Sequence, residues 1–402
     1  MVSRTNRVIV VGAGLSGLSA ALHLTAAGRE VLVLDQQSGP GGRHTCMELD
    51  GYRFDTGPVT FFTPESLAGP LHAVGETVRD WIELLPVDPV CRAHYPDGTT
   101  LDAHADPLKT AAAIGQLCGW PEARAFLRYM RAHLVPPGIV LNDPRTLRLF
   151  GLTSLFGFSP ADCRWYPRGG NQAVARGLGA AAEKHGVSFQ FGVRAEHWET
   201  KAGRITAVHT SDGERLKADA FVFPVKTPNV PWRSSHLVIH LGTGATFSKI
   251  AHSNVHFGKL WQRSRHEVLT RGEMMTDPSI TVLAPSQTDR TAAPRGKAVY
   301  QIVVPVPNLR TAPIDWNVPA TRSYAGEIIA TLEARGYLDL GAGAGLSYVV
   351  TPSDWARQGM AYGIPHISRN STAKLHRTLA NAVVAGPGLI AGARAADRVV
   401  RI

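Results

Sequence analysis

The chain has 402 residues, of which 44% are hydrophobic and 18% are charged, and its formal net charge is +10 at pH 7. This length suits two domains, and the ordinary hydrophobic content excludes a disordered or fibrous protein. The basic balance points to an anionic partner, unless the charges only form a solvated surface.

The cysteines and the apolar runs bear on where the protein is found. Four cysteines are scattered without a C-x-x-C pair, which favours reduced thiols over a disulfide framework or a zinc site; they are Cys46, Cys91, Cys118 and Cys163. No apolar run has the length of a membrane span, and none precedes the first strand. Basic residues are spread out and no nucleic-acid-reading motif occurs, so an anionic membrane surface is the favoured partner and nucleic acid is not expected. We expect a cytoplasmic protein, peripherally associated with the inner face of the membrane.

Residues 7–35 predict a strand, a glycine-rich turn, a helix and a second strand. Gly12, Gly14 and Gly17 have G-x-G-x-x-G spacing. The first glycine permits the turn, the second lets the backbone approach a pyrophosphate, and the third lets the helix pack closely on the strand. Asp35 ends the second strand 23 positions after Gly12, where an acidic residue binds a ribose hydroxyl. The segment predicts a dinucleotide site with phosphates at the helix N-terminus, and the acid makes NADP the least favoured ligand.

A second glycine-rich segment follows the second strand. It contains Gly41, Gly42 and Arg43, and then a D-x-G-P turn that ends in Gly57 and Pro58. At this distance from the first glycines, the two motifs resemble those of the FAD-dependent amine oxidases and carotenoid desaturases. The resemblance implies that Arg43 and its glycines approach the FAD phosphates and ribityl chain. It also implies that the D-x-G-P turn lies near the flavin ring and that FAD is preferred over NAD.

Later stretches extend the resemblance. W-Y-P-R-G-G at residues 165–170 resembles the family's aromatic-P-R-G-G element, at which the chain returns to the FAD domain through a helix that we expect Asn171 to cap. In the family, a following strand reaches the adenine side of FAD, here near Val193. The closing strand and helix resemble the end of the same fold. The cofactor-binding residues predicted from spacing and resemblance together are Gly12, Gly14, Ser16, Gly17, Asp35, Gly41, Gly42, Arg43, Gly57, Pro58, Val193 and Gly386.

The expected fold class is α/β. We expect a Rossmann-like FAD-binding domain of the GR2-type flavoproteins, made from residues 1–65, 166–230 and 370–402. A discontinuous α+β substrate domain is expected from residues 66–165 and 231–369.

Within the group, the resemblance is strongest to bacterial phytoene desaturases, and it is carried by DGYRFDTGP, WIELLPVDPVCRAHYPDGTTLD, WYPRGG, VVPVPNL and TPSDW. It implies FAD-dependent desaturation of a phytoene-like polyene in carotenoid biosynthesis, in which the flavin accepts a hydride and a neighbouring proton is lost. An acyclic hydrocarbon is bound by burial of apolar surface, so its binding residues look like core residues and no catalytic residue is predicted. Two alternatives stay open: an oxidase of the amine or porphyrinogen type, and a non-catalytic flavin- or lipid-binding relative.

No metal site is expected. Two histidine pairs, His236/His240 and His252/His256, have H-x-x-x-H spacing. They lie in predicted strands, where side chains four residues apart on one face are separated by roughly 13 Å, too far to share one ion.

The resemblance also implies that relatives are longer. Matching sequence is interrupted near residues 131–137, 156–165, 225–232, 364–368 and 386–389, and the last of these would carry the family's flavin cover. We expect the chain to be discontinuous at several of these junctions, with consecutive Cα atoms farther apart than the roughly 3.8 Å of a trans peptide.

Overall fold

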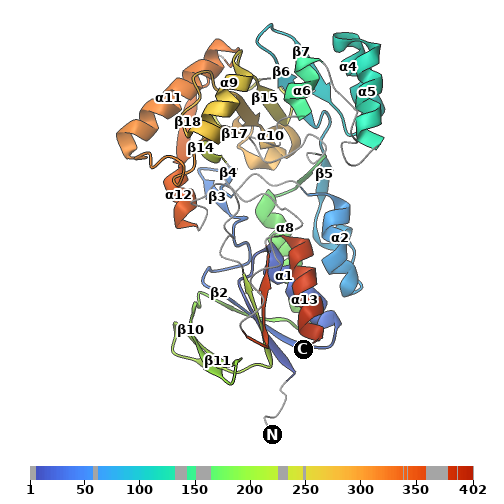
Figure 1. Cartoon of the computed structure of the whole chain (residues 1–402), viewed down its shortest axis with the longest axis vertical. Helices are drawn as coiled ribbons and strands as arrows, with labels where there is room; N and C mark the ends of the chain where they lie inside the picture. The colour runs from blue at the N-terminus through green and yellow to red at the C-terminus, as the bar shows by residue number, and fades with distance from the viewer. Residues whose placement is uncertain are drawn as a thin grey trace.

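The computed structural model describes residues 6–57, 62–131, 143–150, 164–224, 234–247, 250–337, 339–341, 343–358, 379–386 and 388–401. Pro58 and Cys163 lie outside these ranges. At least one residue of each of the five junctions with an expected discontinuity also lies outside them, so that expectation stays a prediction. The described residues form two lobes, one around a five-stranded sheet and one around a seven-stranded sheet (Figure 1).

The lower lobe in Figure 1 is built on a parallel sheet with the strand order β19-β13-β1-β2-β9. These strands are β1 (Arg7–Val11), β2 (Glu30–Asp35), β9 (Ser188–Phe191), β13 (Ala220–Pro224) and β19 (Ala382–Ala385). They come from distant parts of the sequence and are joined by crossovers, as in a Rossmann-like fold. The parallel sheet confirms the expected α/β class.

Both faces of this sheet are covered, which explains why its strands are apolar at consecutive positions. Val8 and Val10 of β1 belong to a core on the helical side, shared with α1 (Leu15–Ala26), α8 (Asn171–Lys184) and α13 (Leu389–Val400). Ile9 belongs to a separate core on the other side. That core is shared with a three-stranded antiparallel sheet made of β10 (Ala195–Lys201), β11 (Arg204–Thr210) and β12 (Arg215–Leu216).

Two short helices, α2 (Pro64–Ala73) and α3 (Val78–Trp81), follow the first glycine-rich segments. Leu67 and Leu71 of α2 are buried in the same core as α1 and α13, because the apolar face of α2 packs on those helices. Residues 66–81 therefore pack with the lower lobe, although they fall inside the range 66–165 predicted for the substrate domain. A helix start is a local signal, and the sequence does not show against which lobe a helix packs. Apart from this difference, the predicted domain ranges stay predictions.

The upper lobe contains a mixed sheet with the strand order β18-β14-β17-β16-β15-β6-β7, in which only the β15 and β6 pair is parallel among the described strands. Its strands are β6 (Cys91–His94), β7 (Thr100–Ala103), β14 (Ser235–Thr243), β15 (Ser253–His256), β16 (Ile280–Leu283), β17 (Ala298–Val306) and β18 (Ala344–Val350). The hairpin of β6 and β7 turns at residues 96–98, where the sequence Pro-Asp-Gly is typical of a tight turn.

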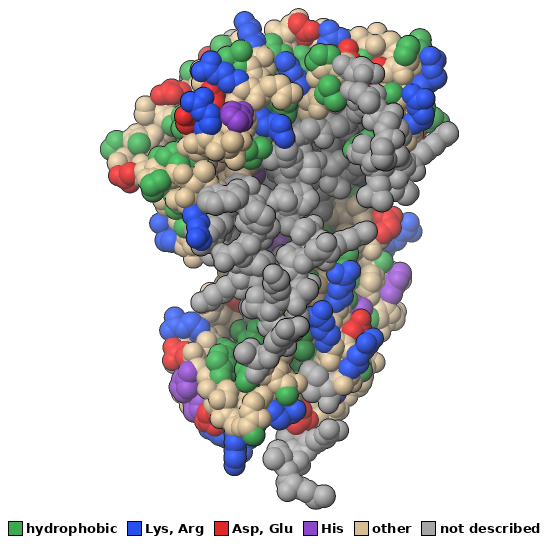
Figure 2. Space-filling model, in the orientation of Figure 1, with side chains coloured by type: hydrophobic (Ala, Val, Ile, Leu, Met, Phe, Trp, Pro, Cys, Tyr) green, Lys and Arg blue, Asp and Glu red, His purple; other side chains and the backbone are tan. Residues whose placement is uncertain are grey.

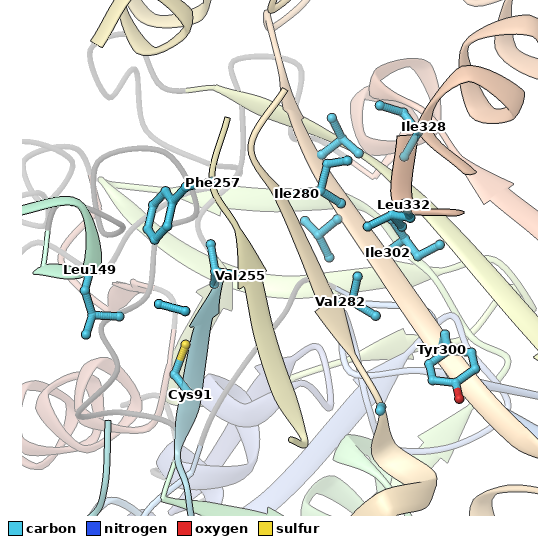
Figure 3. Close-up of a cluster of buried hydrophobic side chains, with 14 of the residues drawn as sticks. Cys91, Leu149, Val255, Phe257, Ile280, Val282, Tyr300, Ile302, Ile328 and Leu332 are labelled. Atoms are coloured by element: carbon cyan, nitrogen blue, oxygen red, sulfur yellow. The ribbon is translucent and has the colours of Figure 1, made fainter. Parts of the chain in front are cut away.

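Helices surround this sheet. They are α4 (Pro107–Cys118), α5 (Trp120–Arg131), α6 (Pro144–Phe150), α9 (Trp261–His266), a π-helix (Glu267–Arg271), α10 (Pro285–Thr288), a 3₁₀ helix (Arg290–Ala292), α11 (Val318–Ala334) and α12 (Pro352–Arg357). Figure 3 shows Ile280 and Ile302 beside Ile328 of α11, whereas Val255 and Phe257 lie on the side of Leu149 of α6. This large core of the upper lobe shares no residue with the two cores of the lower lobe, so it is separate from them.

A hairpin lies between the lobes. It consists of β3 (Cys46–Leu49) and β4 (Tyr52–Asp55) and continues directly from the second glycine-rich segment (Figure 1). Its rings pack on the seven-stranded sheet: a Cβ on Gly242 would come within 2.8 Å of the Tyr52 ring, and the rings of Phe54 and His240 are 5.7 Å apart. A second link between segments is the pairing of β5 (Leu84–Pro86) with β8 (Trp165–Pro167).

Candidate functional site

The glycine-rich turn between β1 and α1 has the geometry that the spacing predicts. Gly12 has a φ of +94°, and its N–H donates to the carbonyl oxygen of Leu34 at 2.7 Å. A Cβ on Gly17 would lie 1.8 Å from the carbonyl oxygen of Gly12, so only glycine lets α1 approach β1 this closely. Gly14 is different, because its φ is −77° and an added Cβ would meet nothing nearer than the Cα of Gly42 at 3.6 Å. The fold leaves space at Gly14, where the motif places a pyrophosphate.

The start of α1 is suited to an anion. Its N-cap is Gly14, which has no side chain to cap the first turn, so the first backbone N–H groups receive no hydrogen bond from the N-cap residue. Such N–H groups, together with the helix dipole, bind phosphate.

Asp35 lies at the carboxyl end of β2 and is buried. One carboxylate oxygen accepts the N–H of Ala13 at 2.6 Å, and the other accepts the N–H of Gln37 at 2.8 Å. The side chain therefore joins the glycine turn to the loop after β2. A carboxylate has about four acceptor positions, so a ribose hydroxyl could be bound in addition.

The second glycine-rich segment lies directly against the first. Gly41 donates its N–H to the carbonyl oxygen of Ala13 at 3.0 Å and forms an isolated β-bridge with Gly14. Gly42 has a φ of +61°, and a Cβ there would come within 2.8 Å of the Cα of Gly14. The two segments thus form one glycine-lined surface at the N-terminus of α1.

Arg43 follows these glycines and is half-buried. Burial lowers the pKa of its guanidinium. The pKa of the neighbouring His44 is lowered to about 4, first by burial and then by the charge of Arg43. A partly desolvated positive charge beside a helix N-terminus favours a bound anion, which fits the predicted diphosphate.

Gly57 packs against this arginine. A Cβ on Gly57 would lie 1.9 Å from the carbonyl oxygen of Arg43, so the D-x-G-P turn and the arginine loop are in direct backbone contact. The Thr56 N–H donates to the carbonyl oxygen of Thr45 at 3.0 Å, which fixes the turn. The last predicted residue of this turn, Pro58, lies outside the described residues.

The remaining predicted residues reach the same region from distant segments. The Val193 N–H donates to the carbonyl oxygen of Asp35 at 3.0 Å, so the return strand ends beside the end of β2. The Ser16 hydroxyl donates to the carbonyl oxygen of Gly386 at 2.7 Å and ties the segment after β19 to α1. All the predicted residues that the structure describes therefore gather at the carboxyl ends of β1 and β2. Their binding to a cofactor stays a prediction.

The start of α8 corrects one expectation. The N-cap is Gly170, with a φ of +81°, and Asn171 is the first helical residue rather than the cap. The capping oxygen belongs to Asp55, whose Oδ1 accepts the Asn171 N–H at 2.8 Å while Oδ2 accepts the Tyr166 hydroxyl at 2.9 Å. Burial raises the pKa of Asp55, although both hydrogen bonds act to lower it. The expectation is wrong because the cap comes from a residue 116 positions away, which local spacing cannot show.

His236, His240 and His256 lie on strands of the upper lobe, as predicted, whereas His252 directly precedes β15. His252 shares a hydrogen bond of 2.8 Å with the hydroxyl of Thr288, and His256 shares one of 2.8 Å with the hydroxyl of Tyr337. Burial lowers the pKa values of His240 and His252 to about 4. Over the described ranges, no group of three His, Cys, Asp or Glu side chains is placed to hold a metal ion.

A set of polar residues between the lobes was not predicted from the sequence. They are Arg53, Tyr166 and Asp289, together with the carboxylate of Asp55, and they join β4 to the start of α8 and to the upper lobe. The only signal was that three of the four lie inside stretches that resemble the family, D-G-Y-R-F-D and W-Y-P-R-G-G. Nothing in their spacing shows that they meet.

The fold and the glycine-lined surface define a Rossmann-like dinucleotide-binding protein. Residues 10–71 match the family model described as NAD(P)-binding Rossmann-like domain. The structure is also similar to a solved oxidoreductase from Methanosarcina mazei, with a TM-score of 0.64, 14% identity and coverage of 98% of this chain and 100% of that chain. At this identity the likeness shows the fold alone.

Two curated relatives narrow the class. The chain is 32% identical to a phytoene dehydrogenase from Streptomyces griseus, over 98% of this chain and 95% of the relative. It is 27% identical to a zeta-carotene-forming phytoene desaturase from Myxococcus xanthus, over 87% of this chain and 81% of the relative. The chain therefore belongs to the phytoene desaturase family of carotenoid biosynthesis, and it is an oxidoreductase.

The first of these alignments also measures how much shorter the chain is. It extends over 483 positions, whereas this chain has 402 residues, so at least 81 positions face gaps in this chain. This confirms that the relative carries additional segments.

No helix in the described part of the chain combines the length and the hydrophobicity needed to cross a bilayer.

Proposed function

We propose that the chain desaturates an acyclic, phytoene-like carotenoid precursor with FAD as the hydride acceptor. The observation that carries the proposal is the glycine-lined surface at the N-terminus of α1, found in a chain 32% identical to a phytoene dehydrogenase. FAD, when bound, supplies the redox chemistry by accepting a hydride from an allylic carbon.

The chain's own residues bind the cofactor and orient it. Gly12 permits the turn, Gly14 leaves room for the diphosphate, and the N–H groups of α1 and the charge of Arg43 stabilise it. Asp35 binds a ribose hydroxyl, and Gly57 lies beside the flavin ring. We assign FAD binding to the lower lobe and substrate binding to the upper lobe.

The direct test is anaerobic mixing of the FAD-loaded, full-length protein with phytoene in liposomes. Bleaching of the flavin absorbance and a product with an additional double bond are expected. FAD that stays oxidised, with unchanged phytoene, would favour the non-catalytic flavin-binding relative. Failure of the protein to bind FAD would contradict the cofactor assignment itself.

We further propose that the protein associates peripherally with an anionic membrane at its cytoplasmic face, where the substrate partitions. Trp120 is 59% exposed at the start of α5, and Arg124 and Arg128 follow at intervals of four on the outer side of that helix. Leu108 of α4 is 64% exposed. Figure 2 shows basic side chains at the upper right of the molecule, where α4 and α5 lie in Figure 1. Exposed apolar residues among arginines suit an anionic lipid surface.

A further inference from the structure

A buried ion pair joins the two lobes beside the glycine-lined surface. Asp289 of the upper lobe lies at the N-cap of the 3₁₀ helix and has no exposed surface. Its Oδ2 accepts a hydrogen bond from the Arg53 guanidinium at 2.6 Å and another from the Gly169 N–H at 2.9 Å. Its Oδ1 accepts the N–H and the hydroxyl of Thr291 at 3.0 and 2.7 Å. One carboxylate therefore holds β4, the turn before α8 and the upper lobe together.

A second carboxylate, that of Asp55, binds the start of α8 from strand β4, which also carries Arg53. Asp55 lies two residues after Arg53 on β4 and accepts the Asn171 N–H at 2.8 Å. The two carboxylates thus bind the backbone on either side of Gly170. A Cβ on Gly170 would lie 2.6 Å from Asp55 Oδ1, so the glycine is needed for this approach.

The arrangement continues into the predicted flavin site. Asp55 is followed two residues later by Gly57, whose backbone is in contact with the carbonyl oxygen of Arg43. From the upper lobe, the side-chain amide of Gln301 on β17 donates to the carbonyl oxygen of Asp55 at 3.2 Å. Arg53, Asp55 and Gln301 therefore connect the upper lobe, through direct contacts, to the turn beside Arg43.

The ionisation of Asp289 and Arg53 is consistent with a stable ion pair between the lobes. Burial acts to raise the pKa of Asp289, but the hydrogen bonds from Gly169 and Thr291 and the charge of Arg53 outweigh it, and the pKa is lowered. Asp289 therefore stays ionised, and Arg53 is its charged partner at 2.6 Å. Because the pair is desolvated, removal of either side chain takes the nearest opposite charge from the other, and Asp289 then keeps only the more distant, half-exposed Arg168 guanidinium at 3.9 Å. In some proteins such a pair specifies one arrangement of the parts that it joins.

We propose that Arg53 and Asp289 are positioning residues, which fix the orientation of the upper lobe, and of the substrate that it binds, relative to the flavin. The inference rests on the FAD-dependent function proposed above. Neither residue is assigned contact with a reacting atom. Their effect is on alignment, to which group transfer is highly sensitive, since a misplacement of about 1 Å can lower the rate by about a hundredfold.

The test uses the full-length protein with the variants Arg53→Gln and Asp289→Asn, the double variant, and the conservative variant Arg53→Lys. The control is Arg92→Gln, which breaks the ion pair between Arg92 Nε and Asp102 Oδ1 at 2.7 Å within the hairpin of β6 and β7, away from the lobe junction. Three quantities are measured for each protein: the FAD dissociation constant by flavin fluorescence, the visible circular dichroism of bound FAD, and the rate of anaerobic flavin reduction by phytoene.

Each single variant is expected to change the flavin dichroism and to slow flavin reduction at saturating phytoene at least about tenfold. The double variant should be no slower than the slower single variant, because both remove the same interaction. The reduction rate of Arg53→Lys should lie between those of Arg53→Gln and the parent. Lysine keeps the positive charge but has a single ammonium group in place of the planar, forked guanidinium. Arg92→Gln should match the parent in dichroism and rate.

Flavin dichroism and reduction rates within twofold of the parent in both single variants would overturn the proposal. Equal losses in Arg92→Gln would do the same, because they would indicate general destabilisation. If Asp289→Asn does not fold, the comparison of Arg53→Lys with Arg53→Gln decides, and equal rates in those two overturn the proposal. A parent protein that binds no FAD would instead contradict the proposed function.

Discussion

Gly14 of the first glycine-rich segment and Gly42 of the second lie in contact but differ in the space that they leave for a side chain. A Cβ on Gly42 would come within 2.8 Å of the Cα of Gly14, whereas a Cβ on Gly14 would stay 3.6 Å from the Cα of Gly42. Gly42 is therefore required by the fold itself, while Gly14 is not. We propose that the need for glycine at position 14 comes from the ligand, and this difference can be tested.

Gly14→Ala is expected to fold normally and to bind FAD poorly. Its φ of −77° suits alanine, so the free energy of unfolding should change by less than about 1 kcal/mol. The added methyl group occupies the approach of the pyrophosphate, and FAD affinity should fall at least about tenfold. Fluorescence titration and urea unfolding measure the two effects. Gly17→Ala is the control: its Cβ would lie 1.8 Å from a carbonyl oxygen, which should lower stability by about 1–3 kcal/mol. Parent-like FAD affinity in Gly14→Ala would contradict the assignment.

Ser16→Ala and Ser19→Ala form a matched pair on α1. Ser16 donates to the carbonyl oxygen of Gly386, and Ser19 donates to that of Leu389, both at 2.7 Å. Each substitution removes one hydrogen bond and should lower the free energy of unfolding by about 1 kcal/mol. Only Ser16 lies in the first turn of α1, so only Ser16→Ala should also weaken FAD binding. Equal FAD affinities in the two variants would remove Ser16 from the site.

His240→Phe is expected to make the protein less sensitive to acid. Burial lowers the pKa of His240 to about 4, and neither ring nitrogen has a hydrogen-bond partner among the residues that the structure describes. The unfolded chain takes up a proton below the ordinary pKa of about 6.5, whereas the folded chain does so only near 4, so His240 lowers stability progressively as the pH falls from 6.5 to 4. A phenyl ring fits beside Phe54 and Tyr348, which already pack on this side chain.

The measurement is urea unfolding of parent and His240→Phe at pH 7.5 and pH 5. The loss of stability between these pH values should be smaller in the variant by about 2 kcal/mol. The control, His266→Gln, changes an exposed histidine and should leave the pH dependence unchanged. An equal loss in parent and His240→Phe would mean that this imidazole is not held neutral.

Membrane binding should depend on the outer face of α5. Arg124→Ser with Arg128→Ser should weaken binding to anionic liposomes at low salt, and the difference should shrink at high salt, because salt screens charges beyond about 8–10 Å. Sedimentation with vesicles measures the bound fraction. Arg295→Ser with Arg322→Ser removes the same charge from exposed positions elsewhere and serves as the control. Equal weakening by the two pairs would indicate net charge rather than a specific face.

The sequence was most informative where its signals are local. The turn of Gly12, Gly14 and Gly17 and the acid at the end of β2 lie where the pattern predicts, because each depends on residues close together in the chain. The helix after Gly170 was also predicted, but its cap was not, because the capping carboxylate of Asp55 is brought from another segment. Similarly, residues 66–81 were assigned to the substrate domain but pack on the lower lobe, which no local signal shows.

By itself, the sequence determined the Rossmann-like class, the glycine-lined surface and the family, because spacing and backbone conformation are properties of short segments. Only the tertiary structure decided which of these glycines the fold requires, how Val193 and Gly386 reach the ends of β1 and β2, and that Arg53 meets Asp289 across 236 positions. Contacts between distant segments depend on how sheets and helices pack, and a polar side chain shows no pattern in the sequence that names its partner. The two lobes are therefore joined by interactions that only the folded chain reveals.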